Sequence, residues 1–360
     1  GKWVCDQCDI LTQQAMPAYV IDKGIATPEL LSHVLVSKYA DHLPLYRQRQ
    51  IFLRAGVDLS RSTLSDWIGR CGVELEPLTN ALKQVVLQQQ VLHADETPVT
   101  IMQMGDDEKK PKKGYVWAYA TTQYNPVHAV IYDFQPSRSG QHAEEFLKGW
   151  QGHLVCDDYS GYKARFKSGD VIEVGCMAHA RRKFHELHVT GKSQIAEQAL
   201  LMIQRLYAIE AELRKNTDGT AEHRREYRQQ YSQPVMQQLY EWLNQHQLTV
   251  PSSSPTARAI NYSLKRWPAL SRYLDNGNLP IDNNWLENQM RPWALGRKNW
   301  LFAGSLRSGQ RAANIMTLIQ SAKLNGLDPY AYLSDVLKRL PTHKVTQIEE
   351  LLPHRWKSNP

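Results

Sequence analysis

The sequence predicts an α/β protein, in which a helical region precedes a mixed sheet and a long helical stretch interrupts it. Three observations predict this class. Residues 27–89 repeat apolar side chains at helical spacing. Residues 90–190 contain short runs rich in Val, Ile, Tyr and Trp, which favour strands, separated by helical segments. Residues 191–279 hold few strand formers and many Gln, Glu and Arg, which favours a helical insertion.

The first helical region has well-marked helix starts. Thr27–Glu29 combines an N-cap residue, a proline at the first helical position and an acid in the first turn. A second helix is predicted over Leu45–Arg54, and Gly56 ends it. Ser60, or Arg61 and the serine after it, opens a third. This pattern is typical of a helix-turn-helix that contacts DNA, with Arg61 near its second helix, but an ordinary helical hairpin would have the same pattern.

The middle of the chain predicts three strands, a helix, a strand, a short connection, a strand and a helix. The first three strands follow one another closely, as in an antiparallel meander. Ser139 is the expected cap of the first helix. In chain order the segments are residues 91–102, 114–122, 128–134, 139–150, 153–159, 170–177 and 178–187. After the insertion, an amphipathic helix is predicted from about Asp282 to Gly296, then an extended stretch from Arg297, and two closing helices up to Pro341.

The charge of the chain favours a polyanionic partner. The net charge is +7, and nucleic acid is the first candidate. Lys163–Lys192 holds seven basic residues against three acids, although a solvated basic face would look similar. A second cluster, which we expect to line the same DNA channel as the first, contains Arg291, Arg297, Lys298, Arg307 and Arg311. With no long apolar stretch and no secretory leader in the sequence, we expect a cytoplasmic protein without a membrane partner.

The cysteines indicate reduced thiols and one half of a metal site. The five cysteines are an odd number in a chain without a secretory leader. Cys5 and Cys8 form a C-x2-C pair, which is half of a typical zinc site. We expect the other half to lie upstream, in a longer protein that would bind Zn²⁺; a chance pair near a terminus is the alternative.

Two strand-end aspartates predict a catalytic metal site. We expect Asp95 at the end of the first strand and Asp157 at the end of the fourth, so the two lie side by side if these strands are neighbours. Two carboxylates that close repel each other unless a divalent cation neutralises them, and hard oxygen ligands suit Mg²⁺. Glu287, on the helix after the insertion, is the candidate for a third ligand. Each acid could instead be a solvated surface group, and Asp158 could replace Asp157, since alternation puts them on opposite faces.

Such a site has a specific chemistry. Two metal ions about 4 Å apart activate a water or a 3′-hydroxyl and stabilise the leaving oxygen of a phosphodiester. Two aspartates and a glutamate can hold them, and basic residues alongside would contact the DNA backbone. The acids and the basic clusters therefore point together to phosphodiester chemistry on DNA.

Several motifs together resemble the transposases of the insertion sequence 66 family, a DDE group with a ribonuclease-H-like core. The resemblance extends from about residue 3 to residue 340, and its alignment favours Asp157 over Asp158. The motifs that carry it are HADETPV at His93–Val99, DDYSGY at Asp157–Tyr162, GCMAHARRKF at Gly175–Phe184, DNNWLENQMRPWALGRKNWLFAGS at Asp282–Ser305 and AKLNGLDPYAYL at Ala322–Leu333.

The resemblance implies a DNA transposase that cleaves at terminal inverted repeats and transfers the 3′-hydroxyl ends to target DNA. It implies Asp95, Asp157 and Glu287 as catalytic ligands of Mg²⁺ or Mn²⁺. His179 and Arg182, one helical turn apart, would contact DNA near the scissile phosphate, although a structural His179 is equally consistent. The implied partners are DNA, further copies of the chain on DNA and accessory proteins of the same element, at the nucleoid.

Two departures from the family pattern qualify this expectation. Asn288 stands where the family has an arginine after the glutamate, and the earlier cysteine pair of the zinc module is absent, so we expect an N-terminally truncated chain. The alternatives are a truncated protein that only binds DNA and a nuclease on the same core that does not transpose.

The expected domain organisation follows from these segments. Residues 1–26 would be the remnant of the zinc module, and 27–89 the DNA-binding helical region. Residues 90–190 and 280–340 would form the catalytic core, interrupted by the helical insertion 191–279. Residues 341–360 would be a C-terminal tail.

Overall fold

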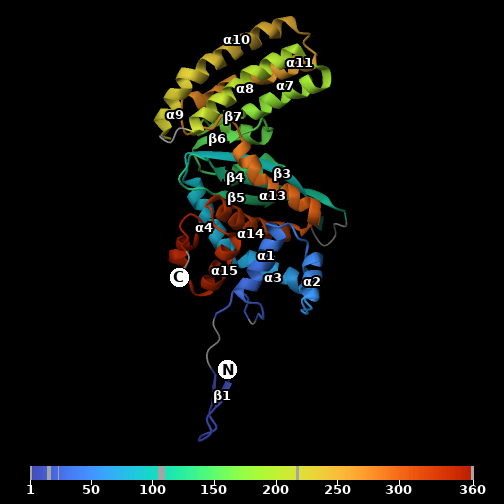
Figure 1. The fold of residues 1–360 in the computed structure, drawn as a ribbon, viewed down its shortest axis with the longest axis vertical. Coiled ribbons are helices and arrows are strands. Elements are labelled where there is room, and N and C mark those ends of the chain that lie inside the picture. Colours follow the sequence, from blue (N-terminus) through green and yellow to red (C-terminus); the bar gives the residue numbers. More distant parts are fainter. Residues whose placement is uncertain (1, 14–17, 23, 104–109, 216–218, 358–360) are drawn as a thin grey trace.

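The computed structural model describes residues 2–13, 18–22, 24–103, 110–215 and 219–357 of the chain. The molecule is elongated, and its central sheet lies between two groups of helices (Figure 1). One group combines the first helices of the chain with the last ones. The other group consists of the helices between Met177 and Lys265 (Figure 1). Sequence segments from both ends of the chain therefore build one end of the molecule together.

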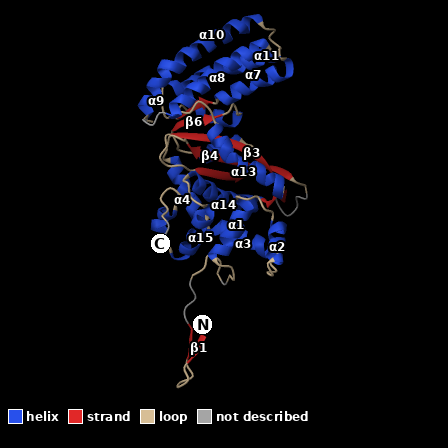
Figure 2. Ribbon diagram, in the orientation of Figure 1, coloured by secondary structure: helices blue, strands red, loops and turns tan. Residues whose placement is uncertain are grey.

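The main sheet is mixed, and its strand order is β5-β4-β3-β6-β7, with β8 paired to β3 as well (Figure 2). β3, β4 and β5 are antiparallel, whereas β6 and β8 run parallel to β3, and β7 runs parallel to β6. The predicted fold class, a ribonuclease-H-like core combined with helical regions, is confirmed. The strands are β3 (Val91–Gln103), β4 (Lys112–Thr121), β5 (Val130–Gln135), β6 (Gly152–Cys156), β7 (Val171–Gly175) and β8 (Phe302–Ser305).

Most helices begin where the sequence places a capping side chain. Thr27, Ser60 and Ser139 each accept a hydrogen bond from a backbone N–H in the first turn of the helix that follows. The helices are α1 (Pro28–Tyr39), α2 (Leu45–Arg54), α3 (Arg61–Glu74), α4 (Glu76–Leu87), α5 (Gly140–Phe146), α6 (Lys163–Lys167), α7 (Met177–Gly191), α8 (Gln194–Lys215), α9 (Ala221–Tyr227), α10 (Gln233–Thr249), α11 (Pro255–Lys265), α12 (Trp267–Ser271), α13 (Asn284–Trp300), α14 (Leu306–Leu324) and α15 (Pro329–Arg339).

Helix α13 lies against the edge of β3 that faces away from β4. β6 pairs with β3 over Val91–His93, and β8 pairs with it from Thr100 onward. Between these two stretches, the side-chain amide of Asn283, just before α13, donates to the carbonyl of Ala94 over 3.1 Å. Near the other end of α13, Arg297 donates to the carbonyl of Pro98 over 2.8 Å. The helix is therefore fixed to β3 at two points.

Alternation along the strands assigns the two acids of β3 to opposite faces of the sheet. Asp95 lies opposite Ala118 of β4, and Ala118 lies opposite Tyr132 of β5. The hydroxyl of Tyr132 donates to a backbone carbonyl of α13, so Asp95 shares the face that α13 covers. Glu96 belongs to the other face, where Phe146 of α5 stacks on the ring of Tyr119.

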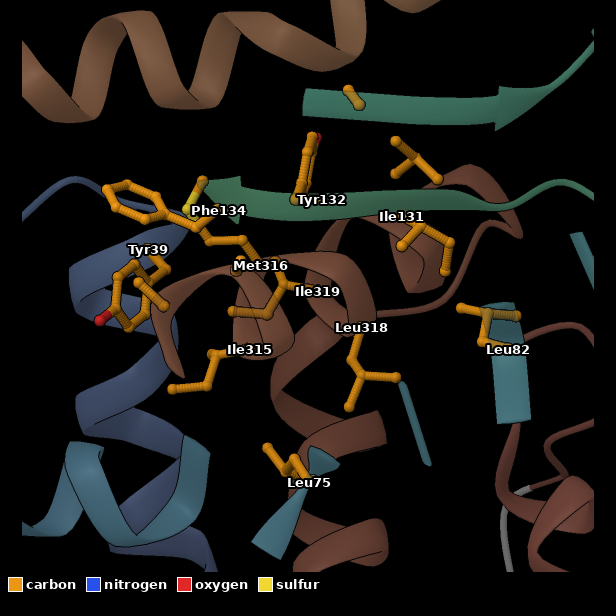
Figure 3. Close-up of a cluster of buried hydrophobic side chains, with 14 of the residues drawn as sticks. Tyr39, Leu75, Leu82, Ile131, Tyr132, Phe134, Ile315, Met316, Leu318 and Ile319 are labelled. Atoms are coloured by element: carbon orange, nitrogen blue, oxygen red, sulfur yellow. The ribbon is translucent and has the colours of Figure 1, made fainter. Parts of the chain in front are cut away.

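Helix α14 runs along the outer edge of β5, and its apolar side chains belong to the hydrophobic core. Ile315, Met316, Leu318 and Ile319 of α14 lie between β5 and the N-terminal helices (Figure 3). At the strand edge, Thr317 Oγ1 accepts from Tyr132 N over 2.9 Å. The edge of β5 is therefore bonded to helix side chains.

A buried ion pair inside the insertion is also bonded to the core. Arg228, in a π-helical turn after α9, lies 2.7 Å from Glu210 of α8, and both side chains are at most 1% exposed. The same guanidinium donates to the hydroxyl of Tyr124, in the turn between β4 and β5, over 3.2 Å. Because an unpaired buried charge is costly, this network ties the insertion helices to the meander.

Two expectations about local structure are wrong. Asp95 does not lie at a strand end, because β3 continues eight residues beyond it, to Gln103. The stretch from Arg297 to Trp300 is helical, since α13 continues past Pro292. Packing explains the second difference: Trp300 packs over Gly296 and edge-on to the ring of Trp293, which continues the helix beyond the glycine.

The first described residues form a small hairpin of β1 (Lys2–Val4) and β2 (Leu11–Gln13). Cys5 and Cys8 are exposed in the turn that joins these strands. The segment after Pro341 is packed at its centre, where Leu351 and Leu352 are buried and the hydroxyl of Tyr332 donates to the carbonyl of Leu351. Within the described ranges, no helix combines the length and the apolar character that crossing a bilayer requires.

Candidate active site

Asp95 lies within β3, and Asp157 directly follows the parallel neighbour strand β6. In the β3–β6 pair, His93 lies opposite Val155. Asp95 and Asp157 each follow two residues later, so the same register, extended by two residues, places them opposite each other. Neighbouring strands are about 4.8 Å apart, which brings the two carboxylates within range of a shared cation. Oδ1 of Asp157 accepts from Tyr159 N over 2.9 Å, which fixes this carboxylate at the turn after β6.

Glu287 approaches the two aspartates from α13, on the same face of the sheet. It lies in the first turn of this helix and is 31% exposed. Its Oε1 is 3.9 Å from Nδ1 of His179, and its Oε2 is 3.8 Å from a guanidinium nitrogen of Arg182, both on α7. The structure thus brings His179 and Arg182, two residues singled out in the sequence, next to Glu287.

The electrostatics of Asp95 show how close the acids are. Burial raises the pKa of Asp95 to about 8, and the charges of Glu96, Asp157 and Glu287 add to the shift. The backbone N–H of Glu96, which donates to Oδ1 of Asp95 over 2.8 Å, opposes it. Without a cation, this carboxyl therefore holds a proton at neutral pH.

The three carboxylates are near one another without being in contact. Within the described ranges, the one group of three metal-binding side chains whose ligand atoms all lie within 4.8 Å of one another is Cys176, His179 and Glu287. Asp95, Asp157 and Glu287 do not form a group this tight. Carboxylates that hold two ions about 4 Å apart need not touch one another.

A buried pair, His93 and Asn283, positions the start of α13. Nδ1 of His93 lies 2.7 Å from Oδ1 of Asn283, and both residues are fully buried. Burial lowers the pKa of His93 to about 4, although the bond to Asn283 opposes this shift. The neutral imidazole therefore donates to Asn283, whose backbone N–H in turn donates to Sγ of Cys176 over 3.2 Å.

Asp158 points to a different set of partners. Its carboxylate lies 2.6 Å from a guanidinium nitrogen of Arg266 and 3.1 Å from Nζ of Lys163. Burial would raise its pKa, but the bond from Lys163 and the charge of Arg266 lower it. Arg266 also lies 2.8 Å from Glu173 of β7, so this arginine of the insertion bridges the ends of two core strands.

Glu96 has its own partners on the opposite face of the sheet. Its carboxylate accepts from Nε of Arg138 over 2.8 Å and from the hydroxyl of Tyr162 over 3.0 Å. Burial raises the pKa of Glu96, although Arg138 opposes the shift. Of the two consecutive acids, Asp95 is therefore the one that faces Glu287.

The basic residues singled out in the sequence fall into separate groups. Arg291 and Lys298 are exposed on α13, and Arg61 is exposed in the first turn of α3. Arg297 donates to Thr97 and Pro98, so its guanidinium holds α13 on β3.

We expected both basic clusters of the sequence to line one DNA channel. This expectation is wrong for Arg307 and Arg311, which lie on α14. These two residues of α14 line a pocket of about 490 Å³ with Lys83 and Asp133. Asp133 lies opposite Trp117, on the face of Glu96 rather than that of Asp95. The physical reason is that α14 turns away from α13 along the edge of β5.

A groove with basic residues on one side lies next to the first turn of α13. It measures about 690 Å³ and lies between α7, α8 and the start of α13. Arg181, Arg182 and His185 contribute its basic side, and Asn284 of α13 lies at its other side. The groove brings exposed guanidinium groups to the same edge of the site as the carboxylates.

The hairpin of β1 and β2, whose turn contains Cys5 and Cys8, lies at one end of the molecule, away from α13 (Figure 1). The backbone N–H of Gln7 and the thiol of Cys8 lower the pKa of Cys5, which favours the thiolate that a metal requires.

The fold defines a ribonuclease-H-like protein in which acids from two adjacent strands and a later helix share one face of the sheet. The sequence also matches a known family over most of its length. Residues 23–311 match the family described as Transposase IS66 family, and residues 317–354 match the IS66 C-terminal element. The chain therefore belongs to the IS66 transposase family.

Similar proteins occur in Sinorhizobium fredii (strain NBRC 101917 / NGR234). The uncharacterized protein y4qI is 38% identical over 97% of this chain, the uncharacterized protein y4jD 38% identical over 99%, and the uncharacterized protein y4hP 35% identical over 99%. The chain spans 66%, 72% and 67% of the lengths of these three relatives, or about two thirds.

Sequence reasoning missed three residues that position the site: His93, Asn283 and Arg266. His93 precedes Asp95 by two residues and so shares its face, a signal that strand alternation contains. Asn283 is the first of two consecutive asparagines, Asn283 and Asn284, at the start of the helix that carries Glu287. Arg266 carries no comparable signal, because its partner Asp158 is 108 residues away in the chain.

Proposed function

We propose that the chain is the catalytic part of a DNA transposase that cleaves phosphodiesters at the ends of its element and transfers the 3′-hydroxyl ends to target DNA. The observation that carries this proposal is the placement of Asp95, Asp157 and Glu287 on one face of a ribonuclease-H-like sheet. Membership of the IS66 transposase family supports the same reaction.

The donor set fits Mg²⁺ or Mn²⁺. All three side chains offer hard carboxylate oxygens, and Oε1 of Glu287 is shielded from solvent with no hydrogen-bond partner among the described residues. The pKa of Asp95 is raised first by burial and then by the neighbouring carboxylates, and a divalent cation would relieve the repulsion among them. Two such ions, when bound, activate the attacking oxygen and stabilise the leaving one.

The remaining side chains of the site act on the substrate and on the acids. Arg182 lies beside Glu287 and in the groove, where it can contact a DNA phosphate near the carboxylates. Burial lowers the pKa of His179, although the charge of Glu287 opposes the shift, so a neutral imidazole faces that acid. Arg291 and Lys298 would contact the DNA backbone from the exposed side of α13. Arg297, which also bonds to β3, would add a further contact to the DNA backbone.

Other parts of the proposal concern binding and assembly. Arg61 and the helices around it would bind the terminal inverted repeats. Cys5 and Cys8 would supply two ligands of a Zn²⁺ site whose other ligands come from elsewhere. Copies of the chain would assemble on DNA at the nucleoid, with accessory proteins of the same element.

Cleavage of element-end DNA in Mg²⁺ tests the catalytic proposal. The substrate is DNA that carries the terminal repeats flanking the gene, labelled so that nicks and strand-transfer products are both resolved. Asp95→Asn, Asp157→Asn and Glu287→Gln should each reduce cleavage about a thousandfold or more, because each removes several kcal/mol of transition-state stabilisation. DNA binding should persist, since basic residues supply it.

Asp158→Asn is the matched control, because it changes the adjacent acid, which binds Arg266 and Lys163. It should retain cleavage within about tenfold. Nicking without strand transfer would favour a nuclease, and DNA binding without any cleavage would favour a protein that only occupies the ends. Wild-type rates in Asp157→Asn would end the proposal.

A further inference from the structure

Three potential metal ligands converge where α7 and α13 meet. Cys176 precedes α7, His179 lies in its first turn, and Glu287 lies in the first turn of α13. One ligand atom from each residue lies within 4.8 Å of the other two. Cys176 is held in place by the N–H of Asn283, which donates to its sulfur.

Two of these side chains face each other without a hydrogen-bond partner. Nδ1 of His179 and Oε1 of Glu287 are both shielded from solvent, and neither has a partner among the described residues. They are 3.9 Å apart, which is too long for a hydrogen bond. Buried polar atoms without partners are rare and costly, so the pair calls for a group between them.

The donor set selects the kind of group. A thiolate, an imidazole and a carboxylate together suit a borderline-soft ion and not Mg²⁺, which prefers oxygen alone. The nitrogen and oxygen ligands of one tetrahedral Zn²⁺ are about 3.4 Å apart. The 3.9 Å between His179 and Glu287 therefore needs to close by only about 0.5 Å.

We propose that Cys176, His179 and Glu287 form a second metal site, which binds a thiophilic divalent cation of the Zn²⁺ class. The fourth position of the ion is left to water, as in three-ligand zinc sites. This site shares Glu287 with the catalytic site of the proposed function. An ion bound here takes that carboxylate away from Asp95 and Asp157, so it would oppose Mg²⁺-dependent cleavage.

Absorption spectroscopy with Co²⁺ tests the site without any need for DNA or catalysis. The whole chain carries Cys5→Ser and Cys8→Ser, so that the exposed pair cannot bind the probe. Titration with Co²⁺ should give a thiolate-to-cobalt charge-transfer band and tetrahedral d–d bands at one equivalent. Zn²⁺ should remove these bands at one equivalent, and a large excess of Mg²⁺ should leave them.

Variants locate the ligands. Cys176→Ser should abolish the charge-transfer band, whereas Cys156→Ser, which changes another buried cysteine, should keep it. His179→Ala and Glu287→Gln should each weaken Co²⁺ binding on the order of a hundredfold or more, since changes outside the ligands already cost 10–100-fold. Glu287→Gln alters a half-exposed side chain, so it tests the site even if Cys176→Ser does not fold.

The proposal fails if the doubly substituted chain shows no charge-transfer band, or if the band survives in Cys176→Ser. It also fails if Glu287→Gln binds Co²⁺ as tightly as the parent. Because these readouts require no DNA cleavage, a chain that binds Co²⁺ at this site but does not cleave would refute the proposed function alone.

Discussion

Nδ1 of His93 lies 2.7 Å from Oδ1 of Asn283, and this buried contact joins the strand of Asp95 to the helix of Glu287. The two residues are 190 positions apart in the chain. The amide of Asn283 also donates to Ala94, the residue between His93 and Asp95. The side chain of Asn283 thus holds the start of α13, where Glu287 lies, next to the part of β3 that carries Asp95.

Replacing Asn283 with Ala should loosen this joint. The change leaves His93 and the carbonyl of Ala94 buried without partners, so we expect a loss of about 1–3 kcal/mol in the free energy of unfolding. Cleavage should fall further than stability explains, because Glu287 is no longer held. Urea denaturation and the cleavage assay measure the two effects. Asn288→Ala, which removes an exposed amide from the same helix, should change stability by less than about 0.5 kcal/mol.

The raised pKa of Asp95 predicts that cation binding depends on pH. Below about pH 8 the carboxyl holds a proton that the cation must displace. The apparent affinity for Mg²⁺ should therefore rise up to about tenfold per pH unit as the pH approaches 8, and then level off. Calorimetric titration at several pH values, in buffers of equal ionic strength, measures this slope. A flat profile would contradict the assignment of Asp95 as a ligand.

The same shift affects the stability of the metal-free protein. In the unfolded chain Asp95 ionises near its ordinary pKa of 3.8, whereas in the folded chain it stays protonated up to about pH 8. The folded state binds more protons in this window, so its free energy of unfolding falls as the pH rises through it. Asp95→Asn serves as the control, because it should remove this dependence and raise the melting temperature by a few degrees near pH 8.

Arg266 should be required to hold the insertion on the core. Its guanidinium is 4% exposed and bonds to both Asp158 and Glu173. Arg266→Ala leaves these two carboxylates without their shared partner, which should cost about 2–4 kcal/mol in the free energy of unfolding. Arg266→Lys should rescue only part of the loss, because an ammonium cannot bind two carboxylates as a fork. Arg258→Ala, on the exposed side of α11, is the matched control and should be nearly neutral.

Arg61 tests whether the N-terminal helices bind DNA. It is exposed in the first turn of α3, where Arg61→Ala should leave folding intact. Affinity for inverted-repeat DNA should fall by about tenfold, and the dependence of binding on salt should become less steep by about one phosphate contact. Fluorescence anisotropy at several salt concentrations measures both. Arg70, which pairs with Asp66 on the same helix, provides a control substitution to Ala. Unchanged affinity in Arg61→Ala would favour a helical hairpin without a DNA role.

The fold was predictable where local signals decide it. Capping by Thr27, Ser60 and Ser139 marks helix starts in the sequence, and the β-rich runs mark the meander. The extent of α13 was not predictable from local signals, because Gly296 favours a helix end. Packing of Trp300 over Gly296 and against the buried ring of Trp293 overrides that preference, and only the folded core positions Trp293.

For the site, alternation along the strand correctly separates Asp95 from Glu96, whereas the strand-end argument fails for Asp95 because β3 continues to Gln103. The contacts that hold these acids in place could not be predicted from the sequence. Asn283 and Arg266 act through partners more than a hundred residues away, and no periodicity encodes such a contact. The separation of Arg307 and Arg311 from the other basic residues likewise depends on the direction in which α14 leaves α13.

The bonds of α14 along β5 have a consequence for how copies of the chain behave when they are crowded. Ser321 Oγ accepts from Val130 N and donates to Val130 O, both over 3.1 Å, and Thr317 bonds to Tyr132 N. An uncovered strand edge would expose these backbone groups to the sheet of a neighbouring molecule and invite intermolecular strand pairing. Proteins gathered on one DNA molecule meet at high local concentration. With its edge occupied by serine and threonine, β5 cannot add a foreign strand, so association is left to surfaces other than this sheet edge.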